Sequence, residues 1–314
     1  MRVGQHPAKS IQEVPRPQTV TVALVTYIPF LSGFYAQSLE VLKVCLNNLW
    51  QNTKIDYDLF VFDNASCTEV QAFLSSAHQQ GKIQYLVFSE KNVGKGGAWN
   101  FIFEAAPGEI IAYADSDISF SPGWLAESLK ILDSFPNAGM VTARPMRSPE
   151  EFYTHSLEWA RQENDITLEN GVYIDWEDYR QHVLSLGTSE AEARAWYESR
   201  TDWRVSKDGV SALIGAAHFQ FSAKKSVLKQ FVPFDMDRPM GQVRMIDARL
   251  NETGYLRLCT TTAYVHHMGN RIAEAGQLDQ KSRRKESQKK LSNIPVVRRT
   301  LLWIYDRIFE LYNQ

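Results

Sequence analysis

Short apolar stretches alternate with amphipathic ones over the first 115 residues of the chain. Thr19–Thr26 is apolar and rich in β-branched residues, as expected of a strand that is covered on both faces. The next segment places leucines at spacings of three and four, which is typical of an amphipathic helix. Continued along the chain, this alternation predicts strands at 19–26, 58–62, 83–88 and 109–114, helices at 37–51 and 68–80, and a third helix that opens in the glycine-rich segment 92–100.

The alternation predicts an α/β, Rossmann-like fold with a mostly parallel central sheet, flanking helices and right-handed crossovers. Ligands of such sheets bind beyond the carboxyl ends of the strands. Polar motifs follow three of the predicted strands at that edge: Asp63-Asn64, the glycine-rich segment 92–100, and Asp115-Ser-Asp117. We therefore expect one binding site there, built from all three motifs.

The chain changes character after this half. Residues 150–210 contain fourteen acidic residues against six basic ones and many aromatic residues, which indicates an inserted, mainly helical subdomain. The core pattern returns at 210–221, followed by a predicted helix at 245–252 and a strand at 255–265 that ends in two histidines. The predicted parts are a flexible leader at 1–18, a domain at 19–280 with halves at 19–145 and 210–271 around the insert, and a helical tail at 281–314.

The composition is that of a globular protein with a sizeable core. Of the 314 residues, 44% are hydrophobic, which excludes a disordered or collagen-like chain. The formal net charge is −2, without the broadly basic footprint of a nucleic-acid-binding protein. The three cysteines have no paired spacing, the N-terminus has no signal-peptide pattern, and no apolar run is long enough to span a membrane. We therefore expect a cytoplasmic protein that binds no nucleic acid.

Asp115 and Asp117 are the sharpest local feature. Two carboxylates one residue apart at the end of a buried strand repel each other, and a divalent cation relieves that repulsion. Proteins hold Mg²⁺ and Mn²⁺ with one or two carboxylates together with phosphate oxygens of the substrate. The other interpretation is a tight turn with two solvated carboxylates, one of which caps the next helix. The position directly after an apolar strand favours the metal site.

The glycine-rich segment and two adjacent histidines are further candidates. The glycines of 92–100 allow the backbone to approach a phosphate at a helix N-terminus, although an ordinary strand-to-helix turn explains them equally well. His266 and His267 end a predicted strand, so their side chains face opposite sides and at most one of them joins the site. A structural role explains a single histidine there as well.

Together, these motifs resemble a family 2 glycosyltransferase with the GT-A fold. The order and spacing of several motifs carry the resemblance. They are Val22-Ala-Leu-Val-Thr-Tyr27, Phe62-Asp-Asn-Ala-Ser66, Asn92-Val-Gly94 with Gly97 and Asn100, Asp115-Ser-Asp117, Arg249-Leu, Gly254-Tyr255 and Val265-His-His-Met-Gly-Asn270. The resemblance covers 19–145 and 210–271 and is absent from 150–210 and from the tail.

The resemblance implies a role for each matching position. Asp63 bonds to the base of the nucleotide, Asp115 faces the ribose or the metal, and Asp117 binds the Mn²⁺ or Mg²⁺ that bridges the diphosphate. The implied nucleotide-sugar-binding residues are Thr26, Tyr27, Asp63, Asn92, Gly94, Lys95, Gly97 and Asp115. The implied metal ligands are Asp115, Asp117 and His267, with His266 the less favoured of the two histidines.

One part of the family pattern is missing from this sequence. The family carries an acidic pair six to seven residues before the Arg-Leu of the late helix, where this chain has Gln242 and Val243. Asp247 is the acidic residue inside that helix before Arg249, so the resemblance makes it a displaced catalytic base. From the residues alone, Asp247 is also explained as a solvated helix residue or as an ion-pair partner of Arg249 or Arg244.

The function implied by the resemblance is the inverting, metal-dependent transfer of a sugar from a UDP-, GDP- or dTDP-sugar to a hydroxyl acceptor. The acceptor would be a glycan, a polysaccharide or a lipid-linked molecule. Two alternatives stay open. The missing acidic pair also fits a catalytically inactive module that binds nucleotides or glycans. Asp115-Ser-Asp-Ile-Ser119 also resembles the phosphoryl-transfer motif of haloacid-dehalogenase phosphatases, which place it after their first strand rather than their fourth.

The tail combines a basic part, KSRRKESQKK, with an amphipathic stretch at 296–312. This pattern is typical of a helix that lies on a membrane surface, which would hold the protein at the inner face of a membrane. Packing against the domain, or against a second copy of the chain in a homo-oligomer, explains the pattern as well.

Overall fold

The computed structural model describes residues 3–237 and 244–272. Ten strands form one mixed sheet in the order β3-β2-β1-β4-β10-β6-β11-β9-β8-β7, and β12 pairs with β5 in a second, small sheet. The strands of the large sheet are β1 (Val20–Thr26), β2 (Asp58–Asn64), β3 (Tyr85–Ser89), β4 (Ile110–Asp115), β6 (Ala138–Thr142), β7 (Thr167–Gly171), β8 (Asp202–Lys207), β9 (Val210–Ile214), β10 (Gln220–Lys224) and β11 (Leu256–Cys259). The small sheet contains β5 (Ile118–Phe120) and β12 (Val265–His267).

Nine α-helices and three 3₁₀ turns surround these strands within the described residues. The α-helices are α1 (Ser38–Asn52), α2 (Thr68–Gln79), α3 (Gly94–Ala105), α4 (Trp124–Ser134), α5 (Thr154–Gln162), α6 (Trp176–Ser185), α7 (Glu190–Glu198), α8 (Lys225–Leu228) and α9 (Arg244–Glu252). The 3₁₀ turns are η1 (Pro7–Ser10), η2 (Gly33–Tyr35) and η3 (Glu150–Phe152). The expected tail at 281–314 lies outside the described residues.

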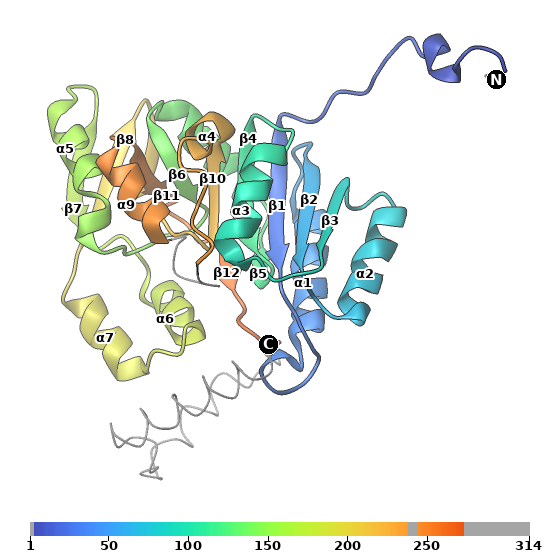
Figure 1. The fold of residues 1–314 in the computed structure, drawn as a ribbon. Helices are drawn as coiled ribbons and strands as arrows, with labels where there is room; N and C mark the ends of the chain where they lie inside the picture. The colour runs from blue at the N-terminus through green and yellow to red at the C-terminus, as the bar shows by residue number, and fades with distance from the viewer. Residues whose placement is uncertain (1–2, 238–243, 273–314) are drawn as a thin grey trace. The chain divides into compact units, whose positions relative to one another are not determined.

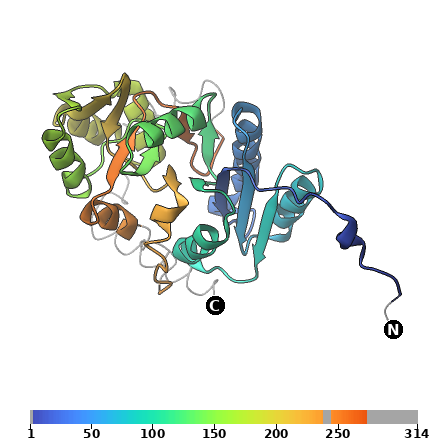
Figure 2. The ribbon, with the colours of Figure 1, turned by 90° about the horizontal axis from the view of Figure 1, so that it is seen from above.

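Strands β3, β2, β1 and β4 are parallel neighbours, as the alternation of strand and helix predicts. β1 alternates its side chains between two cores: Val22 and Leu24 pack with α1 and α2, whereas Ala23 faces the core beneath α3. Figures 1 and 2 show α1 and α3 on opposite sides of these strands. Because β1 is covered on both faces, it can be almost continuously apolar. The α/β fold with a mostly parallel sheet is confirmed, since only β7, β9 and β10 run against the other seven strands of the large sheet.

The stretch 255–265 does not form the single strand that the sequence predicts. Its first part is β11, which lies in the large sheet between β6 and β9. Its end belongs to β12, which pairs antiparallel with β5 in the small sheet. The apolar run is interrupted by Thr260-Thr-Thr262, and the chain changes sheet there.

The insert at 150–210 is more helical than extended, with α5, α6 and α7, but it also contributes two strands. β7 and β8 add to the edge of the large sheet beyond β9, in antiparallel register. The insert is therefore joined to the sheet by backbone hydrogen bonds. The leader at 3–18 contains η1, and all of its residues are exposed.

Candidate functional site

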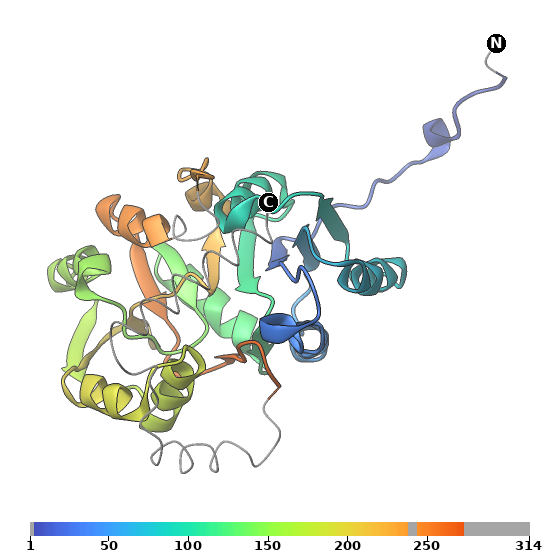
Figure 3. The ribbon, with the colours of Figure 1, turned by 60° about the horizontal axis from the view of Figure 1, so that its bottom comes forward.

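The carboxyl ends of the parallel strands bring the predicted polar residues to one edge. Thr26, at the end of β1, lies in register with Asp63 at the end of β2. Its neighbour Val25 lies in register with Asp115 at the end of β4. Figure 3 turns this edge toward the viewer. The register therefore places the three polar residues on adjacent strands, although 89 positions separate the first from the last along the chain.

Asp63 is fully buried at this edge. Its Oδ2 atom accepts hydrogen bonds from the Ser66 amide and from Gln71 Nε2, both at 3.2 Å. Its Oδ1 atom is buried and has no partner among the described residues, and the same holds for Thr26 Oγ1. Burial raises the pKa of Asp63 above its ordinary value, against the hydrogen bonds that lower it. Two buried polar atoms without partners are the signature of a site that a polar ligand completes.

The glycine-rich segment is fixed to the end of β2 by Asn64, whose role the sequence did not reveal. Asn64 Oδ1 accepts from the Val93 amide at 2.9 Å, and its Nδ2 donates to Asn92 Oδ1 at 2.8 Å. Asn92 Oδ1 also accepts from the Gly94 amide. Helix α3 begins at Gly94, and its N-cap residue Val93 makes no side-chain capping hydrogen bond. The start of this helix is therefore held in place through the Gly94 amide, and the next amides of the first turn are left to an anion.

Gly97 has a packing role in the first turn of α3. A Cβ atom there would lie 2.9 Å from both Met236 Sδ and Val93 Cβ. Glycine is thus required for close packing, which is a sufficient reason for this residue without any ligand. Its predicted contact with the nucleotide sugar stays a prediction.

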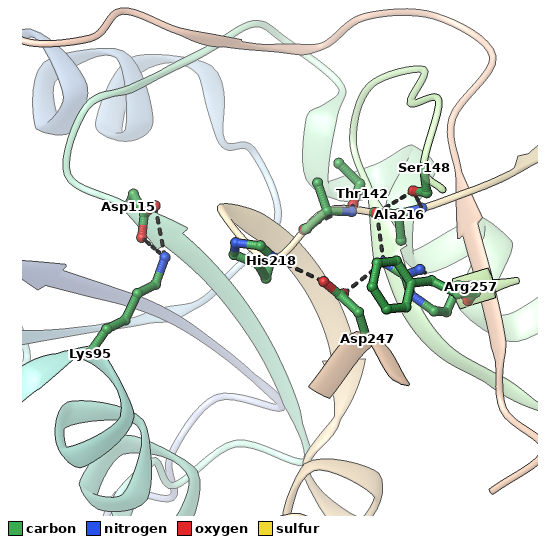
Figure 4. A network of polar contacts seen from close by, with 10 residues as sticks. Lys95, Asp115, Thr142, Ser148, Ala216, His218, Asp247 and Arg257 are labelled. Atoms are coloured by element: carbon green, nitrogen blue, oxygen red, sulfur yellow. Dashed lines mark hydrogen bonds and ion pairs between the residues drawn. The ribbon is translucent and has the colours of Figure 1, made fainter. Parts of the chain in front are cut away.

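Asp115 is held by two partners from the described residues. Lys95 Nζ lies 2.6 Å from Oδ1 and 2.8 Å from Oδ2, and the hydroxyl of Tyr113 donates to Oδ1 at 2.5 Å. Burial and the charge of Asp115 raise the pKa of Tyr113 well above its ordinary value, so this hydroxyl remains a donor. Lys95 thus comes from the first turn of α3 into the same site as the carboxylate (Figure 4).

Asp117 and His267 meet because β5 pairs with β12. The register sets His267 opposite Ile118, and His267 Nε2 lies 3.2 Å from Asp117 Oδ2. On its other side, His267 Nδ1 lies 3.2 Å from Ser185 Oγ. Burial lowers the pKa of His267, but the hydrogen bond and the charge of Asp117 raise it more, so that it stands above its ordinary value. The histidine beside Asp117 is thus His267, the one that the sequence analysis favours over His266.

The donor set of Asp117 and His267 is one that a divalent ion accepts. Asp117 Oδ1 is buried without a partner among the described residues, and carboxylate oxygen with imidazole nitrogen suits Mn²⁺. The described residues contain no group of three or more His, Cys, Asp and Glu side chains arranged to hold a metal ion. Asp115, the third predicted ligand, is engaged by Lys95 instead. This chain therefore offers at most a partial shell there, which substrate oxygens would have to complete.

Asp247 lies on α9 and is buried, with 4% of its surface exposed. Its Oδ1 atom accepts a hydrogen bond from Arg257 Nη2 at 2.6 Å, and its Oδ2 atom lies 2.9 Å from His218 Nδ1. The alternative explanation of Asp247 as a solvated residue or a partner of Arg244 or Arg249 is thus wrong: the residue is buried and its ion-pair partner is Arg257. Arg249 donates to the backbone carbonyl of Phe231 instead. Both carboxylate oxygens are occupied, so the geometry does not favour Asp247 as the group that an acceptor reaches first.

His218, which the sequence did not single out, is the outer member of this group. Its side chain is 36% exposed. It stands at the tip of a tight turn between Ala217 and Gln220, which form an isolated bridge. The next residue, Phe219, accepts a hydrogen bond from the Asp115 amide at 2.8 Å. Figure 4 draws His218 between the Lys95–Asp115 pair and the Asp247–Arg257 pair.

The model of the family described as "Glycosyl transferase family 2" matches residues 34–189, just under half of the chain. Residues 34–189 carry a family 2 glycosyltransferase domain. The match contains Asp63, the glycine-rich segment and the Asp115-Ser-Asp117 motif, so the expected resemblance is confirmed for this part of the chain. The match also runs through 150–189, so the expectation that the insert lacks the resemblance is wrong for those residues. The match ends before His218, Asp247 and His267, and the arrangement of those residues comes from the structure alone.

One curated relative of this chain is an uncharacterized glycosyltransferase of Nostoc sp., 24% identical over 100 residues. The match spans 32% of this chain and only 31% of the relative. Among solved structures, TarS 1–349 of S. aureus has a TM-score of 0.44 and 13% identity, covering 79% of this chain and 60% of that one. The mannosyltransferase PcManGT of Pyrobaculum calidifontis, in complex with GDP-Man and Mn²⁺, has a TM-score of 0.45 and 17% identity, with coverages of 78% and 55%. At these TM-scores, neither structure bears on the substrate or the metal of this protein.

None of the helices within 3–237 and 244–272 combines the length and the apolar character needed to cross a membrane. The motif Asp115-Ser-Asp117 follows β4, the fourth strand along the chain. That position differs from the first-strand position of the phosphatase motif, and nothing in the site geometry favours phosphoryl transfer.

Proposed function

We propose that this glycosyltransferase moves a sugar from a nucleoside diphosphate sugar to a hydroxyl acceptor, with inversion at the anomeric carbon and with the help of Mn²⁺ or Mg²⁺. The observation that carries the proposal is the set of unpartnered buried oxygens around the edge of the parallel sheet: Thr26 Oγ1, Asp63 Oδ1 and Asp117 Oδ1. A buried polar atom left without a partner costs about 1–3 kcal/mol, so these atoms favour a polar ligand.

The nucleoside half of the donor would bind where β1 and β2 end. Asp63 would accept a hydrogen bond from the base through its free Oδ1, with Thr26 and Tyr27 lining the same pocket. Asp115 would face the ribose. Because burial raises the pKa of Asp63, a donor group on the ligand that satisfies the ionised carboxylate would offset part of the desolvation.

The diphosphate would bind against the start of α3. The amides of that turn after Gly94 and the ammonium group of Lys95 both favour an anion. Asn92 and Gly94, fixed by Asn64, would shape the approach of the backbone. The positive charge of Lys95, balanced by Asp115 in the free protein, would then serve the phosphates as well.

A divalent ion would be held by Asp117 and His267, with diphosphate oxygens in its remaining positions. When bound, Mn²⁺ or Mg²⁺ would neutralise the charge that develops on the departing diphosphate. The contribution of this chain is to keep the two ligands at a fixed separation through the pairing of β5 with β12. Asp115, already engaged, is left to the ribose.

Inversion requires a base on the acceptor side that takes the proton from the attacking hydroxyl. The His218–Asp247 pair is the titratable group next to Asp115 that could do so, through the turn that joins Phe219 to the Asp115 amide. A glycan, a polysaccharide unit or a lipid-linked molecule would be the acceptor. Peripheral membrane contact through 281–314 stays a prediction, because those residues lie outside the described part.

The proposal is tested by measuring nucleotide affinity calorimetrically with and without Mn²⁺, in the wild type and in Asp117→Ala. We expect Mn²⁺ to strengthen UDP or GDP binding to the wild type at least 10-fold, and to have no effect in the variant. Asp133→Ala, an exposed residue of α4, is the matched control and should behave as the wild type. Unchanged Mn²⁺-dependent affinity in Asp117→Ala would contradict the metal site.

Turnover separates an enzyme from an inactive binding module. Release of nucleoside diphosphate from a panel of UDP-, GDP- and dTDP-sugars, with free monosaccharides and glycosides as acceptors, is expected for at least one pair. Nucleotide binding without release from any pair would instead support the inactive module.

A further inference from the structure

We infer that His218 is the catalytic base of the proposed sugar transfer, and that Asp247 and Arg257 are positioning residues behind it. This inference rests on the proposed function. It assigns the proton transfer to a residue outside the matched family region and moves it away from Asp247, the acidic residue expected from the sequence.

His218 is more accessible to an acceptor than Asp247 is. Asp247 is almost completely buried and uses both oxygens, one for Arg257 and one for His218. An acceptor hydroxyl would have to break one of these contacts in order to reach it. His218 is more than a third exposed, and its Nε2 atom makes no hydrogen bond to any residue in the described part of the chain. The reachable basic atom of the pair is therefore His218 Nε2.

The contact with Asp247 sets the tautomer of His218. The carboxylate of Asp247 forms an ion pair with Arg257, and a carboxylate in an ion pair only accepts hydrogen bonds. The 2.9 Å contact therefore requires the proton of the neutral imidazole to sit on Nδ1 of His218. The lone pair is then on Nε2, the exposed atom. This is the form that a general base needs.

The backbone before His218 is fixed by hydrogen bonds to other segments. The two residues before His218 are held by side chains from three other segments. Ala216 O accepts from Arg257 Nη2 at 2.7 Å and from Ser148 Oγ at 2.8 Å, and the Ala217 amide donates to Thr142 Oγ1 at 2.8 Å. Arg257 thus binds the backbone beside His218 and the carboxylate that orients its ring (Figure 4). Catalytic groups fixed by such supporting contacts lose little freedom in the reaction.

The turn that carries His218 contacts residues of the proposed donor site. The turn that carries His218 is tied to β4 by the hydrogen bond from the Asp115 amide to Phe219 O. The ring of Phe219 lies 6.1 Å from that of His267, centroid to centroid. Phe219, the neighbour of His218 in the chain, therefore contacts both Asp115 and His267 of the proposed donor site.

The acceptor oxygen forms a bond to the anomeric carbon while its proton moves to His218 Nε2. The bond between the anomeric carbon and the diphosphate oxygen breaks, and its electron pair leaves with the diphosphate. The imidazolium that forms faces Asp247, whose negative charge stabilises it.

The decisive experiment measures nucleoside diphosphate release from the best donor in the full-length protein, with and without added imidazole. His218→Ala should lower kcat about 100-fold or more, with nucleotide affinity changed less than 3-fold. Added imidazole should restore at least 10-fold of the loss, because it fills the space of the missing side chain. His155→Ala, a half-buried histidine outside the site, should keep full activity and show no response to imidazole.

A second test measures kcat of the variant Asp247→Asn. It should lower kcat, and combining it with His218→Ala should cost little more than His218→Ala alone, since both changes remove one unit. The inference is overturned if His218→Ala keeps its rate within 3-fold, or if the folded variant loses activity that imidazole does not restore. If the wild type releases no nucleoside diphosphate from any donor, the proposed function itself fails and the base role fails with it.

Discussion

Asp63 combines a predicted binding role with an unfavourable position for its charge. Its pKa is raised above 3.8 mainly by burial, so the folded state binds a proton more tightly than the unfolded chain does. Such a group stabilises the fold below its ordinary pKa, and that contribution is lost as the pH rises through the folded-state pKa. At neutral pH, the ionised carboxylate therefore lowers the stability of the free protein.

Asp63→Asn should accordingly weaken nucleotide binding while it does not weaken the fold. We expect about a 10-fold or greater loss of affinity, because the hydrogen bond from the base to a carboxylate is lost. The melting temperature relative to the wild type should rise between about pH 4 and pH 7, as the wild-type carboxylate ionises. Calorimetry and melting curves at several pH values measure both. A relative melting temperature that falls over this range would show that ionised Asp63 stabilises the fold.

At the residue scale, the site residues that could be predicted are those that follow the end of a buried strand. Asp63, Asp115 and Asp117 could be placed together because the end of a buried strand is visible locally and parallel strands share an edge. His218 could not be found this way, since its partner Asp247 lies 29 positions later and neither is part of a local motif. A usable signal existed for Arg257: a lone charge within the apolar run Leu256–Cys259 indicates a buried pair.

At the scale of elements, the connection from β9 to β10 depends on Gly215. This residue has φ of +143°, and a Cβ atom on it would lie 2.6 Å from the carbonyl oxygen of Met146. The backbone atom cannot yield as a flexible side chain would. Gly187, with φ of +88°, has no atom within 4 Å of the same position and isolates the effect of the dihedral angle alone.

Gly215→Ala should therefore destabilise the protein by at least about 2 kcal/mol, against about 1 kcal/mol for Gly187→Ala. Gly215→Ala should also lower turnover, because the segment that it displaces leads directly to His218. Urea denaturation of the two variants gives the comparison. Equal losses of stability in the two would mean that the contact with Met146 is relieved without cost.

The pattern of residues also explains why the sequence predicts one strand where the structure has β11 and β12. Both are short and apolar at their starts, and no glycine or proline separates them between 255 and 265. What divides them is their partners: β11 finds β6 and β9, whereas β12 finds β5. Partner strands are tertiary information, and the local pattern does not contain it.

The insert is joined to the rest of the domain by a buried ion pair as well as by strands. Arg147 Nε lies 2.6 Å from Asp202 Oδ1, and both side chains are at most 5% exposed. The second oxygen of Asp202 accepts from the amides of Tyr173 and Ile174. A carboxylate with so many donors is costly to leave unpaired.

Arg147→Met should thus cost about 3–5 kcal/mol of stability, because it leaves Asp202 buried without its counter-ion. Arg204→Met breaks a partly exposed pair with Glu169 in the same insert and should cost about 1 kcal/mol or less. Chemical denaturation distinguishes the two. Similar small losses in both variants would mean that water reaches Asp202 once the arginine is gone.

At the scale of the whole molecule, the proposed site draws on both halves of the chain that surround the insert. Asp63 and Lys95 belong to the first half, and His218 and His267 belong to the second. Residues 3–237 and 244–272 belong to one compact unit, so a ligand that contacts both halves should stabilise that unit as a whole. A ligand that binds only the folded state stabilises it by about 2.7 kcal/mol at 100 times its Kd.

For a unit of this size, that free energy corresponds to a rise in melting temperature of roughly 5 °C. We expect the cognate nucleoside diphosphate with Mn²⁺ to reach it, and the rise to grow with the logarithm of ligand concentration. Asp63→Asn should reduce the rise by weakening the nucleoside contact, whereas Asp117→Ala should remove only the part that depends on Mn²⁺. If the two variants lost the same part, nucleoside and metal would not be held by separate halves of the site, and the division of roles between the end of β2 and the β5–β12 pair would be wrong.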